Sequence, residues 1–230
     1  MIQGLLCEDK IYDLEPLNPI RYYEGIVEGR VLDVGCGTGN LGKFLMGQKN
    51  ECFGITISEQ EAELARKKLT GVTVGDIEAM DTLPFSEHFF DTVIFADSLE
   101  HLRNPKHALS LVKPYLKSDG TVIASIPNVA NFVIRMNLFR GRFEYQKTGI
   151  LDETHLRFYT FKSAQELIRS VGYSIIDIKF QNWNLGFPGF ITRLFSFCEW
   201  EIRERMTRWW PGLFATQFVI YAKKNGERIF

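Results

Sequence analysis

The sequence contains few cysteines, and their spacing does not suggest that they act together. There are four in 230 residues, at Cys7, Cys36, Cys52 and Cys198, and no two form a C-x-x-C pair. That spacing excludes the common zinc motifs and a disulfide framework. We therefore expect no metal centre, and free thiols fit a reducing, cytoplasmic compartment.

Long apolar runs and a strong charge of one sign are also missing. No apolar stretch approaches the roughly 20 residues of a membrane span, and the first residues, with Glu8 and Asp9, do not resemble a signal peptide. The net charge of −1 predicts no general attraction to nucleic acid. Since 45% of the residues are hydrophobic and 24% charged, the chain is expected to form one globular domain over 1–230. The oligomeric state is left open.

The most informative stretch is Val31–Gly39, an apolar strand followed by a loop with glycine at positions 35, 37 and 39. Glycine allows positive φ angles and leaves no Cβ to block a ligand. The N–H groups at the start of the following helix can meet ligand oxygens. This loop is therefore a candidate ligand-binding loop.

Short apolar strands alternate with helices along most of the chain. Strands are expected at 30–35, 52–57, 72–74, 90–95, 121–126, 174–180 and 216–222, and helices at 39–48, 59–69, 106–117 and 161–171. This alternation predicts an α/β fold in which helices cover both faces of a mostly parallel sheet. Ligands of such sheets bind beyond the carboxyl ends of the strands.

Three segments lie outside this alternation. Residues 1–29 are expected to form a lead-in that brings Tyr22 and Tyr23 near the mouth of the site. Residues 128–160 and 183–213 are interpreted as lid or insertion segments. Within the latter, 187–213 mixes Phe and Trp with Arg, which suits peripheral membrane contact, a lipid-linked substrate, a helix packed on the core or a dimer interface.

The pattern D-x-G-x-G-x-G from Asp33 to Gly39 resembles motif I of the class I S-adenosylmethionine (SAM)-dependent methyltransferases. The resemblance extends from residue 30 to about residue 126, with a weaker match to the C-terminus. It implies a Rossmann-like seven-stranded sheet with an antiparallel last strand and a small helical lid. It also implies SAM as cofactor and S-adenosylhomocysteine as product.

The resemblance assigns cofactor contacts at the ends of several strands. Asp33 would accept hydrogen bonds at the methionine end of SAM, beside the loop residues Gly35, Cys36, Gly37 and Gly39. A carboxylate there also offsets the positive charge of the ligand. Asp76 would take the adenine amino group and Ile77 would cover the ring. The segment that starts with Ala96 and Asp97 would pass the methionine moiety.

The ribose contact departs from the family pattern. The second strand ends at Thr56, where an acidic residue is usual, and Ser58 and Gln60 follow as substitutes. Gly54–Ser58 is similar to the second-strand region of cyclopropane-fatty-acid synthases, which also use SAM. The spacing Gly37-x-Gly39-x-x-Gly42 satisfies the dinucleotide fingerprint as well, but the acidic residue that the fingerprint requires is missing.

Two segments supply candidate acceptor-side residues. Ala96–Leu102, similar to methyltransferases of the ubiquinone-biosynthesis type, contains His101, which could take a proton from a hydroxyl or simply fix the loop. The block 149–160 resembles methyltransferases of bacterial cell-envelope glycan assembly. In it, Asp152 and His155 would share a helical face, and the carboxylate would raise the imidazole pKa. Arg157 could bind a substrate phosphate or carboxylate, as could Arg140 and Arg142, or could tie the lid to the sheet.

These residues predict methyl transfer from SAM to a hydroxyl oxygen of a small or glycan-like acceptor. The alternatives are a quinone-like or lipid-like acceptor, a protein that binds SAM or a nucleotide without turnover, and an NAD oxidoreductase. The charge balance and the absence of an N/D-P-P-Y motif disfavour methylation of nucleic acid.

Overall fold

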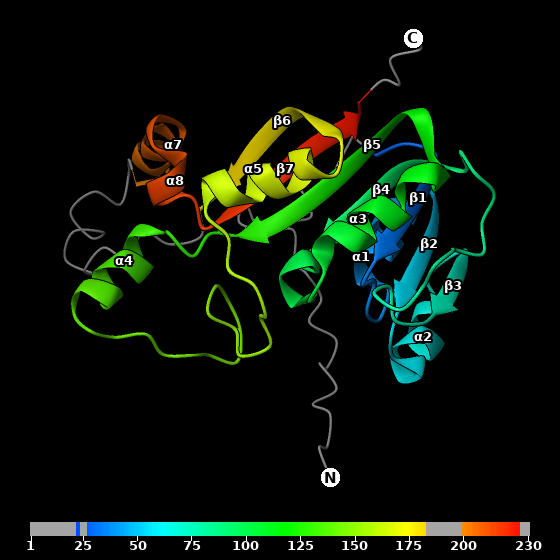
Figure 1. Ribbon diagram of the computed structural model, residues 1–230, viewed down its shortest axis with the longest axis horizontal. Coiled ribbons are helices and arrows are strands. Elements are labelled where there is room, and N and C mark those ends of the chain that lie inside the picture. Colours follow the sequence, from blue (N-terminus) through cyan, green and yellow to red (C-terminus); the bar gives the residue numbers. More distant parts are fainter. Residues whose placement is uncertain (1–21, 24–26, 183–198, 226–230) are drawn as a thin grey trace.

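A seven-stranded sheet with helices on both faces forms the centre of the computed structural model, which describes residues 22–23, 27–182 and 199–225 (Figure 1). The strands are β1 (Arg30–Val34), β2 (Glu51–Thr56), β3 (Gly71–Val74), β4 (Phe90–Ala96), β5 (Leu116–Pro127), β6 (Tyr173–Gln181) and β7 (Gln217–Lys224). The helices are α1 (Asn40–Met46), α2 (Glu59–Ala65), α3 (Pro105–Leu111), α4 (Phe132–Phe139), α5 (Phe161–Ser170), α7 (Glu199–Trp209) and α8 (Pro211–Phe214), with 3-10 turns η2 (Leu99–His101) and η3 (Lys113–Tyr115).

The strand order is β3-β2-β1-β4-β5-β7-β6. β1 pairs in parallel with β2 and β4, β2 with β3, and β4 with β5. β7 runs antiparallel to both of its neighbours, β5 and β6. The predicted mostly parallel sheet with an antiparallel last strand is therefore confirmed.

Successive residues of each central strand point to opposite faces, and each face has its own core. On one face Leu32 of β1, with its counterparts on β4 and β5, packs against α3 and α5. On the other face Val31 packs with residues that include Leu45 of α1, Ala65 of α2 and Tyr23. This double covering explains why the strands are apolar on both sides.

Two predicted helices are too long. The helix expected at 59–69 ends at Ala65, and the other differs more. The expected helix at 106–117 ends at Leu111, passes into the turn η3, and gives way to β5 at Leu116. Pro114 explains the early end, because its ring removes a backbone N–H and clashes with the preceding turn of an α-helix. β5 consequently starts earlier than expected, and its register with β4 shifts between Phe90 and Thr92.

The insertion at 128–160 is anchored to the chain just before β7. The side chains of Asn128 and Asn131 are buried, and both donate to the carbonyl oxygen of Ala215, at 2.8 and 3.0 Å. Asn131 also caps α4 by accepting from the N–H of Val133. These bonds hold α4 beyond the carboxyl end of β5, beside α8 (Figure 1). No helix in the described part of the chain is long and apolar enough to cross a membrane.

Candidate active site

The glycine loop after β1 has the backbone that its sequence predicts. Gly35, Gly37 and Gly39 adopt φ angles of 83°, 51° and 78°, in the left-handed region that glycine tolerates. At Gly39 a Cβ would lie 3.1 Å from the Cα of Ala65 in α2, so the loop has no room for a side chain there. Cys36, between these glycines, is buried, and burial raises the pKa of its thiol to about 12.

Asp33 lies at the tip of β1 behind this loop. Its side chain is 2% exposed, and its Oδ1 has no hydrogen-bond partner among the described residues. Burial raises the pKa of this carboxyl to about 7. A buried acceptor without a donor is costly, so the position fits a ligand that brings N–H groups or positive charge.

The end of β2 carries a carboxylate that the sequence analysis missed. Thr56 is buried, and its hydroxyl donates to Oε2 of Glu61 at 2.7 Å. Oε1 of Glu61 faces the glycine loop, 4.0 Å from where a Cβ of Gly37 would lie. Ser58 caps α2, as expected, by accepting from the N–H of Glu61. The available signal was the position of Glu61 in the first turn of α2.

The predicted substitute Gln60 is exposed on α2. At the end of β3, Asp76 is also exposed and its Oδ1 accepts from the N–H of Glu78 at 2.9 Å, which closes a local turn. Ile77 beside it is buried. Both predicted adenine residues thus lie at the carboxyl end of the sheet, one strand beyond Glu61.

The end of β4 is strained at Asp97, which follows Ala96 and has a φ of 48°. Ser125 holds it twice: the Asp97 N–H donates to the Ser125 hydroxyl at 2.9 Å, and that hydroxyl donates to Oδ1 at 3.0 Å. The side-chain amide of Gln217 on β7 also donates to Oδ1. Asp97 as a whole is exposed, yet its carboxyl is withdrawn from water, and this desolvation raises its pKa. Strain of this kind is concentrated at functional sites.

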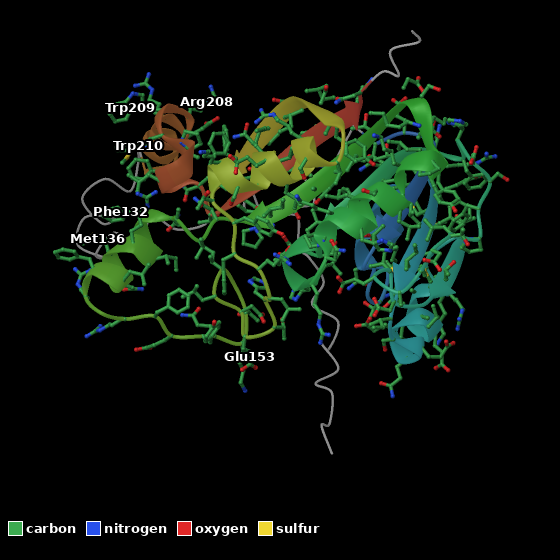
Figure 2. All side chains as sticks on the ribbon, viewed as in Figure 1. Phe132, Met136, Glu153, Arg208, Trp209 and Trp210 are labelled. Atoms are coloured by element: carbon green, nitrogen blue, oxygen red, sulfur yellow. The ribbon has the colours of Figure 1, made fainter. Side chains whose placement is uncertain are left out.

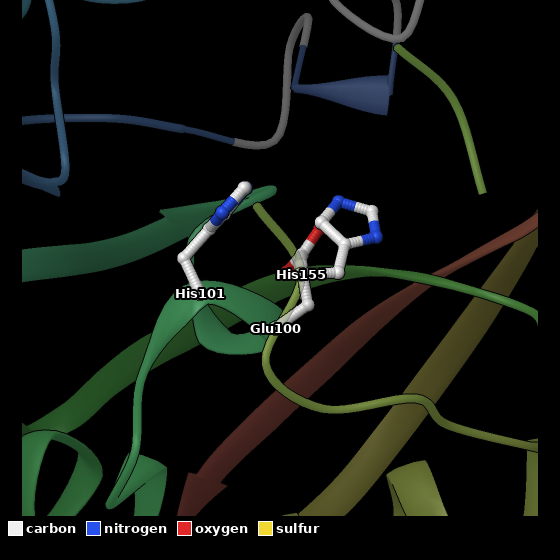
Figure 3. Close-up of side chains that lie close together, drawn as sticks. All are labelled: Glu100, His101 and His155. Atoms are coloured by element: carbon white, nitrogen blue, oxygen red, sulfur yellow. The ribbon is translucent and has the colours of Figure 1, made fainter. Parts of the chain in front are cut away.

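The two candidate histidines, His101 and His155, lie close together although they are far apart in the sequence. His101 contacts Thr154, which is 53 positions further along the chain and directly precedes His155. The ring centroids of the two histidines are 4.8 Å apart. The carboxylate of Glu100 lies close to both rings (Figure 3). This residue is 1% exposed and was not among the candidate site residues. Backbone bonds from the N–H groups of Leu156 and Arg157 to the carbonyl oxygen of Glu100 hold the two segments together.

Two details of the acceptor-side interpretation are wrong. Asp152 and His155 lie in a turn rather than on a helix, and Oδ1 of Asp152 accepts from the N–H and hydroxyl of Thr154 at 2.8 and 2.6 Å. The pKa of His155 is lowered rather than raised, because burial of the imidazole outweighs the charge of Asp152. Arg157 donates to the carbonyl oxygen of Arg103, which ties the loop to the segment between η2 and α3.

Three aromatic side chains pack together next to this cluster. Phe143, Tyr145 and Phe158 pack with centroid separations of 5.6–6.3 Å, and Phe158 also lies 6.3 Å from the ring of His155. Phe143 is 41% exposed and Tyr145 58% exposed. They form an apolar wall that is open to solvent next to titratable groups.

Several known proteins with similar sequences are methyltransferases. A family model described as a methyltransferase domain matches residues 32–124. A ubiquinone biosynthesis O-methyltransferase from Neisseria meningitidis is 34% identical over 200 residues, which span 81% of both chains. An uncharacterized protein from Methanocaldococcus jannaschii is 32% identical over 162 residues, which span 64% of this chain and 62% of that protein.

Solved structures with the same fold are more distant in sequence. One is a SAM-dependent methyltransferase from Thermotoga maritima that is described as a possible histamine N-methyltransferase. Its TM-score is 0.62 at 20% identity, and the match covers 90% of this chain and 87% of the Thermotoga chain. One from Archaeoglobus fulgidus has a TM-score of 0.59 at 23% identity, with 89% of each chain covered. Both support the fold.

Proposed function

The chain belongs to the class I SAM-dependent methyltransferases, and we propose that it methylates a hydroxyl oxygen of a small, ring-bearing acceptor. The proposal for the acceptor rests on one observation. Glu100, His101 and His155 form a cluster near the carboxyl end of β4, and the rings of Phe143, Tyr145 and Phe158 form an aromatic wall beside it.

The carboxylates at the strand ends fit SAM. Asp33 offers a buried oxygen without a donor, which suits the charged methionine end of the cofactor. Glu61 is held by Thr56 beside the glycine loop, where we propose that it accepts from the ribose hydroxyls. Asp76 and Ile77 stay our candidates for the adenine, and Ala96 and Asp97 for the methionine moiety.

When bound, SAM supplies an electrophilic methyl group on a sulfonium that is a good leaving group. The chain then has to align the acceptor oxygen, exclude water and remove its proton. In our proposal the aromatic wall of Phe143, Tyr145 and Phe158 positions the acceptor ring. The hydroxyl faces the imidazoles of His101 and His155, where its proton is released. Asp152 is connected to His101 by the hydroxyl of Thr154, which lies 3.2 Å from Nδ1 of His101 and donates to Oδ1 of Asp152.

The acceptor class is proposed from two observations that point to rings with hydroxyl groups. The aromatic wall suits stacking against a flat or apolar ring, and the Neisseria relative is named for ubiquinone biosynthesis, so a quinone-like phenol is the first candidate. The 149–160 block favours a glycan-like acceptor as the second candidate, because the apolar face of a sugar can use the same wall.

We test this with methyl-labelled SAM and two acceptor panels, one of catechol-type phenols and one of nucleotide sugars and free sugars. We expect labelled methyl ether in one panel, which identifies the class. His101→Ala and His155→Ala should each retain SAM affinity and lose turnover. The matched control His88→Asn removes an imidazole from the turn before β4 and should keep full activity. Full activity in both cluster variants would remove the proposed role in proton release.

We further propose that the enzyme works in a reducing, cytoplasmic compartment, because Cys36 and Cys52 are buried free thiols. Peripheral membrane contact through 187–213 remains part of the proposal. Much of that range lies outside the described residues, but Trp209 and Trp210 are 82% and 53% exposed at the end of α7, next to Arg208 (Figure 2). Such residues suit a lipid surface from which an apolar acceptor could be taken.

A further inference from the structure

The carboxylate of Glu100 is buried without the hydrogen bonds that a buried charged group needs. The side chain is 1% exposed, and neither oxygen has a hydrogen-bond partner among the described residues. The nearest cationic candidate, Nε2 of His155, is 3.9 Å from Oε1, beyond hydrogen-bond distance. A buried carboxylate in this state is costly unless a ligand compensates its charge.

The two imidazoles are oriented as metal-bound histidines usually are. Nδ1 of His155 lies 3.1 Å from the carbonyl oxygen of Ile150, and Nδ1 of His101 lies 3.2 Å from that of Thr154. A carbonyl oxygen can only accept, so each Nδ1 carries the proton and each Nε2 keeps its lone pair. Fixing one ring nitrogen on a carbonyl oxygen is how proteins orient an imidazole toward a metal ion.

We propose that Glu100, His101 and His155 bind a divalent first-row transition-metal ion. One ligand atom from each residue lies within 4.8 Å of the others. Around a tetrahedral ion with bonds of about 2.1 Å, ligand atoms are about 3.4 Å apart, so the triad contracts by roughly 1 Å on binding. Two imidazoles and one carboxylate suit zinc, iron, cobalt or manganese better than magnesium or calcium.

Three protein ligands leave coordination positions open for the acceptor, and this role of the ion rests on the proposed function. A hydroxyl oxygen bound to a divalent ion loses its proton near neutral pH, which passes to water. The oxygen lone pair then forms the new O–CH3 bond, while the S–CH3 bond breaks and its electron pair returns to sulfur. With the ion in place, the imidazoles act as ligands, and no side chain has to take the proton.

The cysteine spacing gave no sign of a metal site. Here the ligands are a pair of adjacent residues on a 3-10 turn and one residue from a distant loop, which the fold brings together (Figure 3). No regular spacing in the sequence connects them.

Metal binding is measured directly on untagged full-length protein, treated with EDTA and desalted. Co²⁺ is titrated while its visible d–d absorption is followed, and SAM affinity is measured calorimetrically on the same samples. We expect saturation at one Co²⁺ per chain in the wild type and in His88→Asn. Glu100→Gln and His101→Gln should lose Co²⁺ affinity by at least about 100-fold, the upper end of what loss of a supporting partner of a metal ligand costs. Both variants should retain their SAM affinity, which shows that they are folded.

Each outcome decides between the two proposals. Absence of a saturable Co²⁺ spectrum, or equal binding by wild type and Glu100→Gln, overturns the metal site. Methyl transfer that persists in EDTA in that case leaves the proposed function standing with a histidine base. Stoichiometric Co²⁺ binding without transfer to either acceptor panel supports the metal site and contradicts the proposed acceptor.

Discussion

Replacing Asp33 by Asn is expected to stabilise the cofactor-free protein at pH 8 and to abolish SAM binding. Asp33 is buried at the tip of β1, and its Oδ1 has no partner in the described part of the chain. Asn has nearly the same shape but no charge, so it removes the cost of burying an ionised carboxylate. The cofactor loses the acceptor that its charged methionine end requires.

The magnitude follows from the pKa. Burial raises the pKa of Asp33 from 3.8 to about 7. Between these values the folded state holds a proton that the unfolded state has released, so the free energy of unfolding falls as pH rises from about 4 to about 7. At about 1.36 kcal/mol per unit, the loss is about 4 kcal/mol above pH 7. The buried Asn amide offsets about 1–3 kcal/mol of the gain, since it also needs partners.

The assay is denaturant unfolding of wild type and Asp33→Asn without SAM, at intervals from pH 4.5 to pH 8.5. We expect a net stabilisation of about 1–3 kcal/mol at pH 8, and each kcal/mol raises the melting temperature of a chain of this size by roughly 2–4 °C. The difference between the two proteins should grow from pH 5 to pH 7 and then level off. Asp97 and Glu100 have raised pKa values too, but they are present in both proteins. A variant that is less stable at pH 8, or a difference that does not depend on pH, would refute the reasoning.

Three further substitutions test other parts of the molecule. Glu61→Ala should weaken SAM binding by about tenfold through lost hydrogen bonds, measured by calorimetry, and unchanged affinity would separate Glu61 from the ribose. Gly39→Ala should destabilise the fold by about 1–3 kcal/mol in denaturant unfolding, because an alanine there must adopt a φ of 78° with its Cβ 3.1 Å from the Cα of Ala65. A neutral result would contradict the close packing of the loop. Phe90→Ala removes a fully buried ring that packs against the partly buried rings of Phe53, Phe85 and Phe89, and it should cost about 3–5 kcal/mol. A loss below about 1 kcal/mol would show that the cluster collapses around the cavity.

Most of the sheet could be predicted from the sequence, because the central strands bury both faces and are therefore apolar along their length. Asp33 and the glycine loop could be predicted because they are local in sequence: the loop directly follows β1 and directly precedes α1. Helix ends were less predictable. Pro114 ends α3 earlier than the apolar pattern indicated, and β5 extends back to Leu116.

The parts of the site that were missed depend on contacts between distant segments or on side-chain direction. Thr56 was correctly recognised as a departure from the acidic pattern, but Glu61 was overlooked because its carboxylate turns back from α2 toward β2. Glu100 was passed over beside His101 because only the fold shows that it is buried against His155. The pKa of His155 was given the wrong sign because burial cannot be read from neighbouring residues.

The place of β7 in the sheet has a consequence for how the enzyme is assembled during synthesis. β7 lies between β5 and β6, although every other strand precedes it in the sequence. Until it is made, the edges of β5 and β6 are open, and such edges are where nascent chains aggregate or swap partners. Its first residue, Gln217, also holds Asp97. The nascent chain can therefore neither close its sheet nor complete its site before β7 inserts, which delays cofactor capture until synthesis has passed that strand.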